Sequence, residues 1–171
     1  MEGHTEKITM HGNQLTLEGN LPHVGDSAPD FKALDNDLLP VTLASFQKKI
    51  RIIISVPSLD TPVCDLETRR FNNEAGSLGS NVEIIVISMD LPFAQKRWCG
   101  AAGVKNLTTL SDHFDASFGK NYGVLIKELR LLARTVFVVD REGIIKYIQI
   151  INELTEEPDY NEVLDVVKKI V

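Results

Sequence analysis

The sequence predicts a single α/β domain in which helices cover both faces of a mixed β-sheet. A chain of 171 residues has about the usual length of one domain. Runs of β-branched residues alternate with segments of helical character, which is typical of parallel strands joined by helices. Near the C-terminus two such runs follow each other directly and predict an antiparallel pair. No repeat, low-complexity tract or linker interrupts the chain, so we expect one domain over residues 1–171.

Two β-hairpins are expected in the N-terminal part of the chain. Turn-forming residues at 11–13 (His-Gly-Asn) and 35–37 (Asp-Asn-Asp) separate short segments with strand character. The expected strands are residues 7–10 paired with 14–18, and residues 32–34 paired with 38–42. We expect the first hairpin to cap one end of the domain.

A central strand and a capped helix come next. Residues 51–56 form a continuous run rich in β-branched residues, which is typical of a strand buried on both faces. The turn residues 57–60 follow it. Thr61 then suits an N-cap and Pro62 suits the first helical position, which predicts a helix that runs through Phe71.

The second half of the chain repeats this alternation. An apolar strand is expected at 82–88. Asp90-Leu91-Pro92 then repeats the pattern of a cap residue followed by proline and predicts a helix through Cys99, which Gly100 and Gly103 are expected to end. The remaining expected elements are a strand at 108–110, a helix at 116–122, strands at 135–140 and 144–151, and a terminal helix at 160–170. The order βαβαβαββα is satisfied by a thioredoxin-like fold with an N-terminal β-hairpin.

The composition excludes several classes of partner. Eighteen Lys and Arg against 24 Asp and Glu give a formal charge of −6, which repels a phosphate backbone, so we expect no nucleic-acid partner. The longest apolar runs fall far short of the roughly 20 residues that cross a bilayer, so we expect no membrane span. The polar N-terminus lacks the apolar segment of a secretory signal peptide, so we expect a cytoplasmic protein.

Cys64 and Cys99 are the two cysteines of the chain, and they are the most informative residues. In a reducing compartment two cysteines indicate either inert buried thiols or redox chemistry. The predicted cap at Thr61 places Cys64 in the first turn of a helix, where free backbone N–H groups and the helix dipole stabilise a thiolate. The acidic neighbours Asp60 and Asp65 oppose this effect.

Several blocks of the sequence, taken together, match one family. Residues 57–64, Pro-Ser-Leu-Asp-Thr-Pro-Val-Cys, fit the pattern Pro-x-x-x-Thr-x-x-Cys of the peroxiredoxins. The longer blocks that carry the same resemblance are residues 56–71, 90–101, 109–112, 122–124 and 132–134. In order and spacing the chain resembles, over nearly its whole length, the thiol peroxidase subfamily of the peroxiredoxins, of the atypical 2-Cys type.

The resemblance implies a role for each of five residues. Cys64 takes the place of the peroxidatic cysteine, Thr61 that of the hydroxyl that hydrogen-bonds thiolate and substrate, and Pro57 that of the residue that shapes the loop. Arg134 takes the place of the cation of the site, and Cys99 that of the resolving cysteine. The implied enzyme is a thiol peroxidase that reduces hydrogen peroxide and organic hydroperoxides in antioxidant defence, forms an intramolecular disulfide and is recycled by thioredoxin. The resemblance also implies a homodimer that needs no cofactor or metal.

Physical chemistry is consistent with this set of residues. A lowered pKa raises the fraction of Cys64 present as thiolate but also makes that thiolate a weaker nucleophile, so it accounts for only a small part of peroxidase activity. Cleaving an O–O bond needs donors that stabilise the charge of the leaving oxygen, and Arg134 would supply a fixed cation. A disulfide needs Cα atoms within about 5.5 Å, which packed helices seldom allow. We therefore expect the sulfurs of Cys64 and Cys99 to lie apart in the reduced form, and a helix start to unwind during turnover.

Two departures from the family pattern concern Trp98, where phenylalanine is expected, and the compact segment 127–130. Trp98, with Phe71 and Phe93, either lines an apolar substrate mouth or belongs to the core. Other interpretations of the site residues also stay open. Both cysteines could be structural, Thr61 only a helix cap, and Arg134 a solvated charge at a strand end.

Three other functions are open to the chain. A metal site formed by Cys64, Cys99 and His113 is disfavoured because no ligand pair has the usual spacing. A thiol–disulfide oxidoreductase is disfavoured because it would normally use a Cys-x-x-Cys motif. A redox-sensing module, whose disulfide alters a binding surface without turnover, is the remaining alternative.

Overall fold

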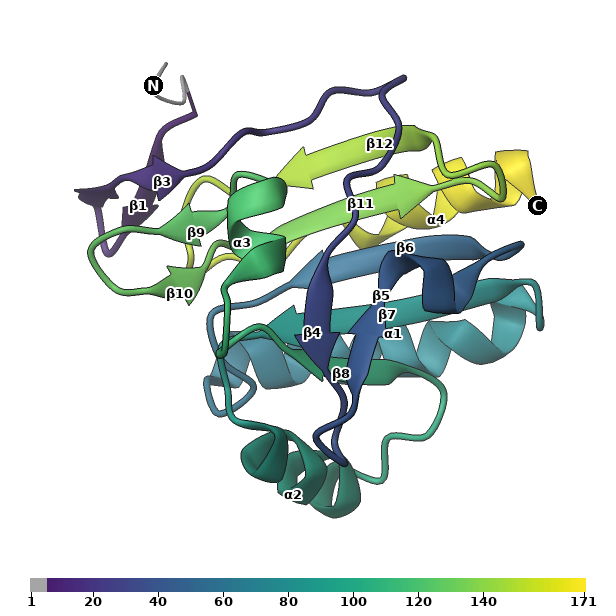
Figure 1. The fold of residues 1–171 in the computed structure, drawn as a ribbon, viewed down its shortest axis with the longest axis horizontal. Coiled ribbons are helices and arrows are strands. Elements are labelled where there is room, and N and C mark those ends of the chain that lie inside the picture. The colour runs from purple at the N-terminus through teal and green to yellow at the C-terminus, as the bar shows by residue number, and fades with distance from the viewer. Residues whose placement is uncertain (1–5) are drawn as a thin grey trace.

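A computed structural model describes residues 6–171 and contains a seven-stranded mixed sheet with helices on both faces (Figure 1). The strand order in the sheet is β12-β11-β6-β7-β8-β4-β5. Its strands are β4 (Lys32–Leu34), β5 (Pro40–Thr42), β6 (Ile50–Ser55), β7 (Val82–Ser88), β8 (Thr108–Ser111), β11 (Thr135–Val139) and β12 (Ile145–Ile150). β6, β7 and β8 are parallel, whereas β11 is antiparallel to both β6 and β12. The predicted mixed sheet is therefore confirmed.

Two hydrophobic cores lie on the two faces of this sheet, because successive side chains of β6 point to opposite sides. Ile52 and Ile54 belong to the core under α1 (Pro62–Leu78) and α4 (Tyr160–Ile170). Ile53 belongs to the core on the other face, which includes residues of α3 (Ser117–Asn121). Figure 1 shows α1 and α4 behind the sheet and α3 in front of it. Every residue of β6 is buried, as the prediction of a central strand requires.

The two helices that carry the cysteines begin where the sequence predicts and end later. α1 continues past Phe71 and stops at Gly79, whose φ is 84°. α2 (Pro92–Ala102) includes Gly100 and ends at Gly103, which has the left-handed φ of 66° that suits a helix C-cap. The prediction that Gly100 helps to end this helix is wrong, because one glycine costs a helix only about 1 kcal/mol.

Asp90 has a different role from the predicted helix cap. The N-cap of α2 is Leu91, and no side chain caps the helix. The carboxylate of Asp90 instead accepts hydrogen bonds from Ser58 Oγ at 2.7 Å and from Leu59 N at 2.8 Å. It therefore ties the loop after β6 to the start of α2.

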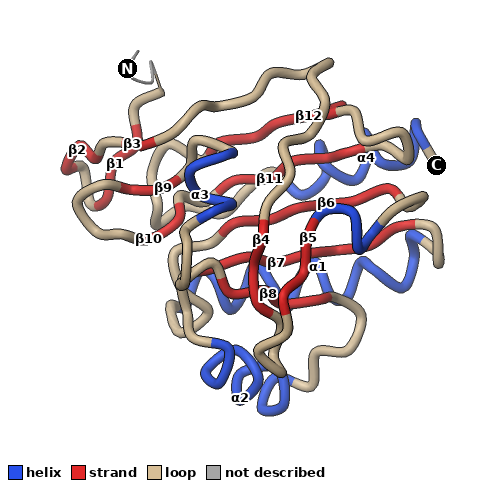
Figure 2. The backbone as a smooth tube through the Cα atoms, in the orientation of Figure 1, coloured by secondary structure: helices blue, strands red, loops and turns tan. Residues whose placement is uncertain are grey.

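The N-terminal segment forms small sheets beside one end of the large one, as Figure 2 shows. The predicted first hairpin is present as β1 (Ile8–Met10) and β2 (Asn13–Leu15). The continuation of its second strand is separate, as β3 (Leu17–Glu18), and pairs with β9 (Leu125–Ile126), which in turn pairs with β10 (Leu131–Leu132). The sequence did not predict β9 and β10, because two-residue strands leave no periodic pattern. β5 is followed by a short 3₁₀ helix, η1 (Leu43–Phe46). Within residues 6–171, no helix has the length and apolar character needed to traverse a bilayer.

Candidate active site

The loop between β6 and α1 is held by the Thr61 cap. Thr61 has an extended backbone (φ −91°, ψ 147°), and its Oγ1 accepts a hydrogen bond from Cys64 N at 3.4 Å. The predicted N-cap is confirmed. The hydroxyl of Thr61 donates to Ser58 O at 2.9 Å, and within residues 6–171 it makes no hydrogen bond to the Cys64 sulfur. The hydrogen bond to the thiolate that the family role implies is therefore absent from this arrangement.

Cys64 lies in the first turn of α1, and its side chain is fully buried. Its neighbours include the apolar core between α1, α4 and the sheet. The sulfur is nevertheless in polar contact, because Arg134 Nη2 donates to Cys64 Sγ at 3.3 Å. The thiol is therefore not sealed in a purely hydrophobic environment.

Arg134 is the most heavily bonded side chain of the site. It directly precedes β11, and only 1% of its surface is exposed, so the interpretation as a solvated strand-end charge is wrong. Its Nη1 pairs with Glu67 Oε2 at 2.5 Å, and Nε and Nη2 donate to Leu154 O at 3.2 and 2.8 Å. Burial lowers the pKa of Arg134, but the charges of Glu67 and Cys64 outweigh burial and raise it above its ordinary value. The guanidinium stays charged and fixed beside the sulfur.

Glu67 is a residue of the site that the sequence analysis missed. It lies three positions after Cys64, so both side chains are on the same face of α1. Burial raises the pKa of Glu67 to about 7, although Arg134 beside it acts in the opposite direction. The i, i+3 spacing from Cys64 was the one signal available, and a glutamate at that spacing is far more often on a solvated helix face.

A cavity of about 370 Å³ opens next to these residues. Its walls come from the N-terminal hairpin, the loop before α1, the turn between β9 and β10, and the segment after β12. The lining residues are Met10, His11, Pro57, Ser58, Thr61, Pro62, Val63, Leu129, Leu131, Arg134, Leu154 and Thr155. Three sequence-predicted site residues, Pro57, Thr61 and Arg134, therefore share one cavity. Cys64 does not line it, although its sequence neighbour Val63 and its hydrogen-bond partner Arg134 do.

Cys99 lies apart from this cluster, on α2. It is partly buried, and its Sγ is 3.4 Å from Thr109 Oγ1, which also donates to Asn36 Oδ1 at 3.0 Å. Both cysteines are free thiols, and they have different polar partners. The structure therefore brings Cys64, Thr61, Pro57 and Arg134 together and leaves Cys99 on the neighbouring helix.

Comparisons with known proteins identify the family. A family model described as Redoxin matches residues 23–164. The chain is 53% identical over 161 residues to the thiol peroxidase of Halalkalibacterium halodurans, covering 94% of this chain and 96% of that protein. It is 51% identical over 165 residues to the thiol peroxidase of Bacillus subtilis, covering 96% and 98%. The chain belongs to the thiol peroxidases of the Redoxin family.

Solved structures agree with this assignment. A peroxiredoxin-like protein from Aquifex aeolicus superposes with a TM-score of 0.91 at 41% identity, covering 99% of this chain and all of that one (100%). The reduced 2-Cys peroxiredoxin of Plasmodium vivax superposes with a TM-score of 0.73 at 25% identity, covering 87% and 96%. The thioredoxin-like fold predicted from the sequence is confirmed, and the protein is an enzyme that reduces peroxides.

Other candidate residues of this peroxidase lie outside the site. Phe71 and Trp98 are buried in the core, and Phe93 is 67% exposed. None of the three lines the cavity beside Arg134, so Phe71 and Trp98 are core residues and Phe93 is a surface residue outside that cavity. Across residues 6–171, no three His, Cys, Asp or Glu side chains converge as a metal site would require.

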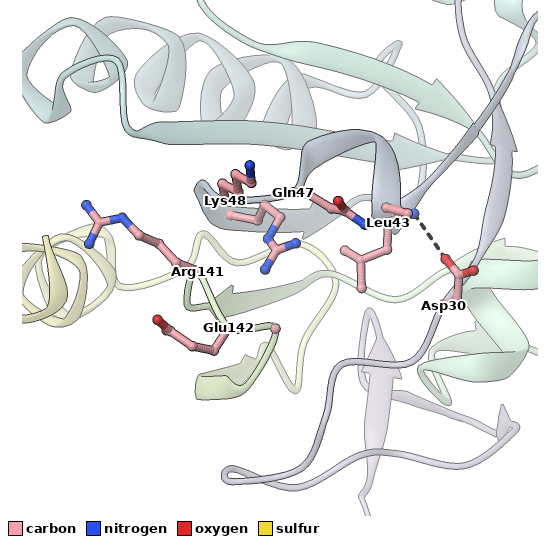
Figure 3. Close-up of a pocket in the computed structure, with 9 residues that line it drawn as sticks. Asp30, Leu43, Gln47, Lys48, Arg141 and Glu142 are labelled. Atoms are coloured by element: carbon pink, nitrogen blue, oxygen red, sulfur yellow. Dashed lines mark hydrogen bonds between the residues drawn. The ribbon is translucent and has the colours of Figure 1, made fainter.

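A second, polar cavity of about 410 Å³ lies at the opposite end of β6. Figure 3 shows Lys48, Gln47 and Leu43 on one side of it, and Arg141 and Glu142 on the other. Neither cysteine lines this cavity, and neither does any hydroxyl side chain. It is separate from the cluster of Cys64, Thr61 and Arg134, which lies at the end of the sheet where β6 leads into α1.

Proposed function

We propose that the enzyme reduces hydrogen peroxide and organic hydroperoxides through a sulfenic acid on Cys64, which Cys99 converts into an intramolecular disulfide. A thioredoxin-type dithiol then reduces this disulfide. One observation carries the proposal: the buried guanidinium of Arg134 contacts the sulfur of a cysteine that lies in the first turn of a capped helix.

In the first step the Cys64 thiolate attacks the nearer peroxide oxygen and the O–O bond breaks. The electron pair of that bond leaves on the distal oxygen, which takes a proton and departs as water or an alcohol. Cys64 is oxidised to the sulfenic acid. Arg134 stabilises the negative charge on sulfur and then on the leaving oxygen, and it needs no reorganisation because Glu67 and the Leu154 carbonyl already hold it.

Substrate reaches the sulfur through the cavity beside Arg134. Pro57 and Thr61 form its wall at the start of α1, and most of the lining is apolar. Such a lining suits the organic part of a hydroperoxide. Because Cys64 is fully buried, the side chains between cavity and sulfur must move for the peroxide to make contact.

In the second step the Cys99 thiolate attacks the sulfenic sulfur of Cys64. The S–O bond breaks, the hydroxide takes a proton and leaves as water, and the disulfide forms. This step protects Cys64, because a waiting sulfenic acid can be oxidised further to the sulfinic acid. The thiols lie on separate helices, so one or both helix starts unwind to bring the Cα atoms to about 5.5 Å.

Peroxide consumption by the purified enzyme with a thioredoxin system tests this cycle. Steady turnover that Cys64→Ser abolishes supports the proposal, and Cys99→Ser should allow one turnover but no recycling by thioredoxin. A single stoichiometric oxidation of the wild-type protein would instead favour the redox-sensing module. A Cys99→Ser enzyme that recycles fully would remove Cys99 from the mechanism.

The proposed setting is the cytoplasm, where a thioredoxin system keeps thiols reduced. We further propose that the enzyme is a homodimer, in keeping with the resemblance on which the site residues were assigned. Light scattering on the purified protein distinguishes a dimer from a monomer.

A further inference from the structure

The sequence neighbours of the two cysteines are bonded to each other across the helices. Asp65 follows Cys64 on α1, and Trp98 precedes Cys99 on α2. Trp98 Nε1 donates to Asp65 Oδ1 at 2.8 Å. The indole is 8% exposed, so the hydrogen bond comes from a side chain that is otherwise packed in the core.

Arg69 reinforces this contact. Its Nε donates to the second carboxylate oxygen of Asp65 at 2.9 Å, and its guanidinium carbon lies 5.8 Å from the centroid of the Trp98 ring. Arg69 Nη1 also reaches Ala102 O at 3.3 Å, at the end of α2. Asp65 therefore has a donor on each oxygen, one from each helix.

The geometry of α2 shows what this contact opposes. Consecutive residues of an α-helix are about 100° apart around its axis. While the Trp98 indole is directed at Asp65 on α1, the Cys99 sulfur is directed at Thr109. For Cys99 to attack Cys64, α2 must turn or unwind at this point, and that movement takes Trp98 away from Asp65.

We propose that Trp98 and Asp65 form a latch between α1 and α2 that slows the attack of Cys99 on the Cys64 sulfenic acid. Trp98 and Asp65 are positioning residues, and neither touches the reacting atoms. The latch sets how the sulfenic acid divides between disulfide formation and further oxidation by peroxide. This inference rests on the proposed resolving role of Cys99.

Trp98→Phe tests the latch, because phenylalanine keeps an aromatic ring in the core and removes the N–H donor. Asp65 keeps its bond to Arg69 and remains 36% exposed, so it is not left buried without a partner. Loss of one hydrogen bond to a partly exposed carboxylate predicts that disulfide formation accelerates about three- to tenfold. The second-order reaction of Cys64 with peroxide should not change.

The matched control is Arg97→Ala. Arg97 joins α2 to the loop just before α1, through Asp60 at 3.4 Å, but these side chains are 69% and 61% exposed. A pair of this kind contributes little. Arg97→Ala should resolve at the wild-type rate, which separates the latch from a general loosening of α2.

The measurement is a quenched time course after one equivalent of hydrogen peroxide, with mass spectrometry of the linked Cys64–Cys99 peptide. Trp98→Phe should form this peptide faster and should need several-fold more peroxide for half-maximal sulfinic acid on Cys64. An unchanged or slower rate of peptide formation, with the first step intact, overturns the latch alone. If the wild-type protein forms no linked peptide, the resolving role of Cys99 fails, and the latch fails with it.

The wild-type protein offers a second readout that needs no variant. Trp98 is its single tryptophan, so the intrinsic emission reports this one side chain. Disulfide formation should expose the indole and shift its emission to longer wavelength with the same rate constant as the linked peptide. Emission that stays constant while the disulfide forms would show that Trp98 does not leave its place, and would overturn the proposal.

Discussion

Replacing Glu67 by glutamine should change how the stability of the reduced protein depends on pH. Glu67 is fully buried beside Arg134, and burial raises its pKa from 4.5 to about 7. Below pH 4.5 the side chain is protonated in the folded and the unfolded protein alike. As the pH rises towards 7, the unfolded chain ionises first, so the free energy of unfolding of the wild type decreases over this window.

The size of the effect follows from the two pKa values. The difference between 4.5 and about 7, at about 1.36 kcal/mol per pH unit, corresponds to about 3 kcal/mol. Glutamine does not titrate, so Glu67→Gln should lack this decrease. Asp112, whose pKa burial raises to about 6, titrates in both proteins and cancels in the comparison.

Urea unfolding at intervals between pH 4.5 and 8 measures the difference. The free energy of unfolding of Glu67→Gln should rise relative to the wild type as the pH increases, by about 3 kcal/mol across the range. Glu74→Gln is the control, because Glu74 is on the same helix in a solvent-accessible pair with Arg70. Parallel curves for Glu67→Gln and the wild type would refute the argument that burial of Glu67 governs its protonation.

Three further substitutions test other parts of the structure. Arg134→Lys keeps a positive charge but loses the forked guanidinium that reaches Glu67, Cys64 and Leu154. Stopped-flow kinetics should therefore show the reaction with peroxide slowed by roughly 100-fold. A rate near that of the wild type would contradict the role of the guanidinium. Thr61→Val removes the cap and should cost about 1 kcal/mol in urea unfolding, whereas Thr61→Ser should retain it; equal losses in both would exclude capping as the cause. Gly19→Ala should lower the stability of the folded protein by more than about 2 kcal/mol in thermal unfolding, because φ of Gly19 is 99° and the added Cβ would lie 2.1 Å from Lys120 O. A stability near that of the wild type would show that the backbone relaxes freely.

Local signals in the sequence predicted the elements that position Cys64. The run before Ser55 is apolar on both faces and is buried on both faces, and Thr61 followed by Pro62 starts a helix where the cap places it. These features depend on neighbours within a few residues, so the sequence contains them. The position of the cysteine in the first turn of α1 follows from them directly.

Features that depend on distant partners were missed or misjudged. The sequence pattern predicted Asp90 as a helix cap, but its carboxylate accepts hydrogen bonds from Ser58 and Leu59, some thirty residues earlier in the chain. Glu67 has the spacing of an ordinary helix-surface glutamate, and only its contact with Arg134 reveals its place in the site. Arg134 itself was assigned through the family pattern, since nothing local distinguishes it from a solvated charge.

The N-terminal hairpin does more than cap one end of the domain. It fixes the segment of residues 152–154, whose Leu154 carbonyl in turn binds Arg134. The carboxylate of Glu153 accepts hydrogen bonds from Thr9 Oγ1 and from the backbone of His11 and Gly12, and these bonds lower its pKa to about 2. The backbone of Thr9 bonds Asn152 O and Leu154 N, one on each side of Glu153.

These contacts fix the carbonyl of Leu154, which accepts two hydrogen bonds from Arg134. A guanidinium placed by Glu67 alone could rotate about that pair, whereas the second anchor defines its plane and directs Nη2 at Cys64. The hairpin at the start of the chain and the loop before α4 therefore jointly determine where positive charge meets the sulfur. In the proposed mechanism, preorganisation of this kind would let one buried cation act on both thiolate and leaving oxygen without a cost of rearrangement during the reaction.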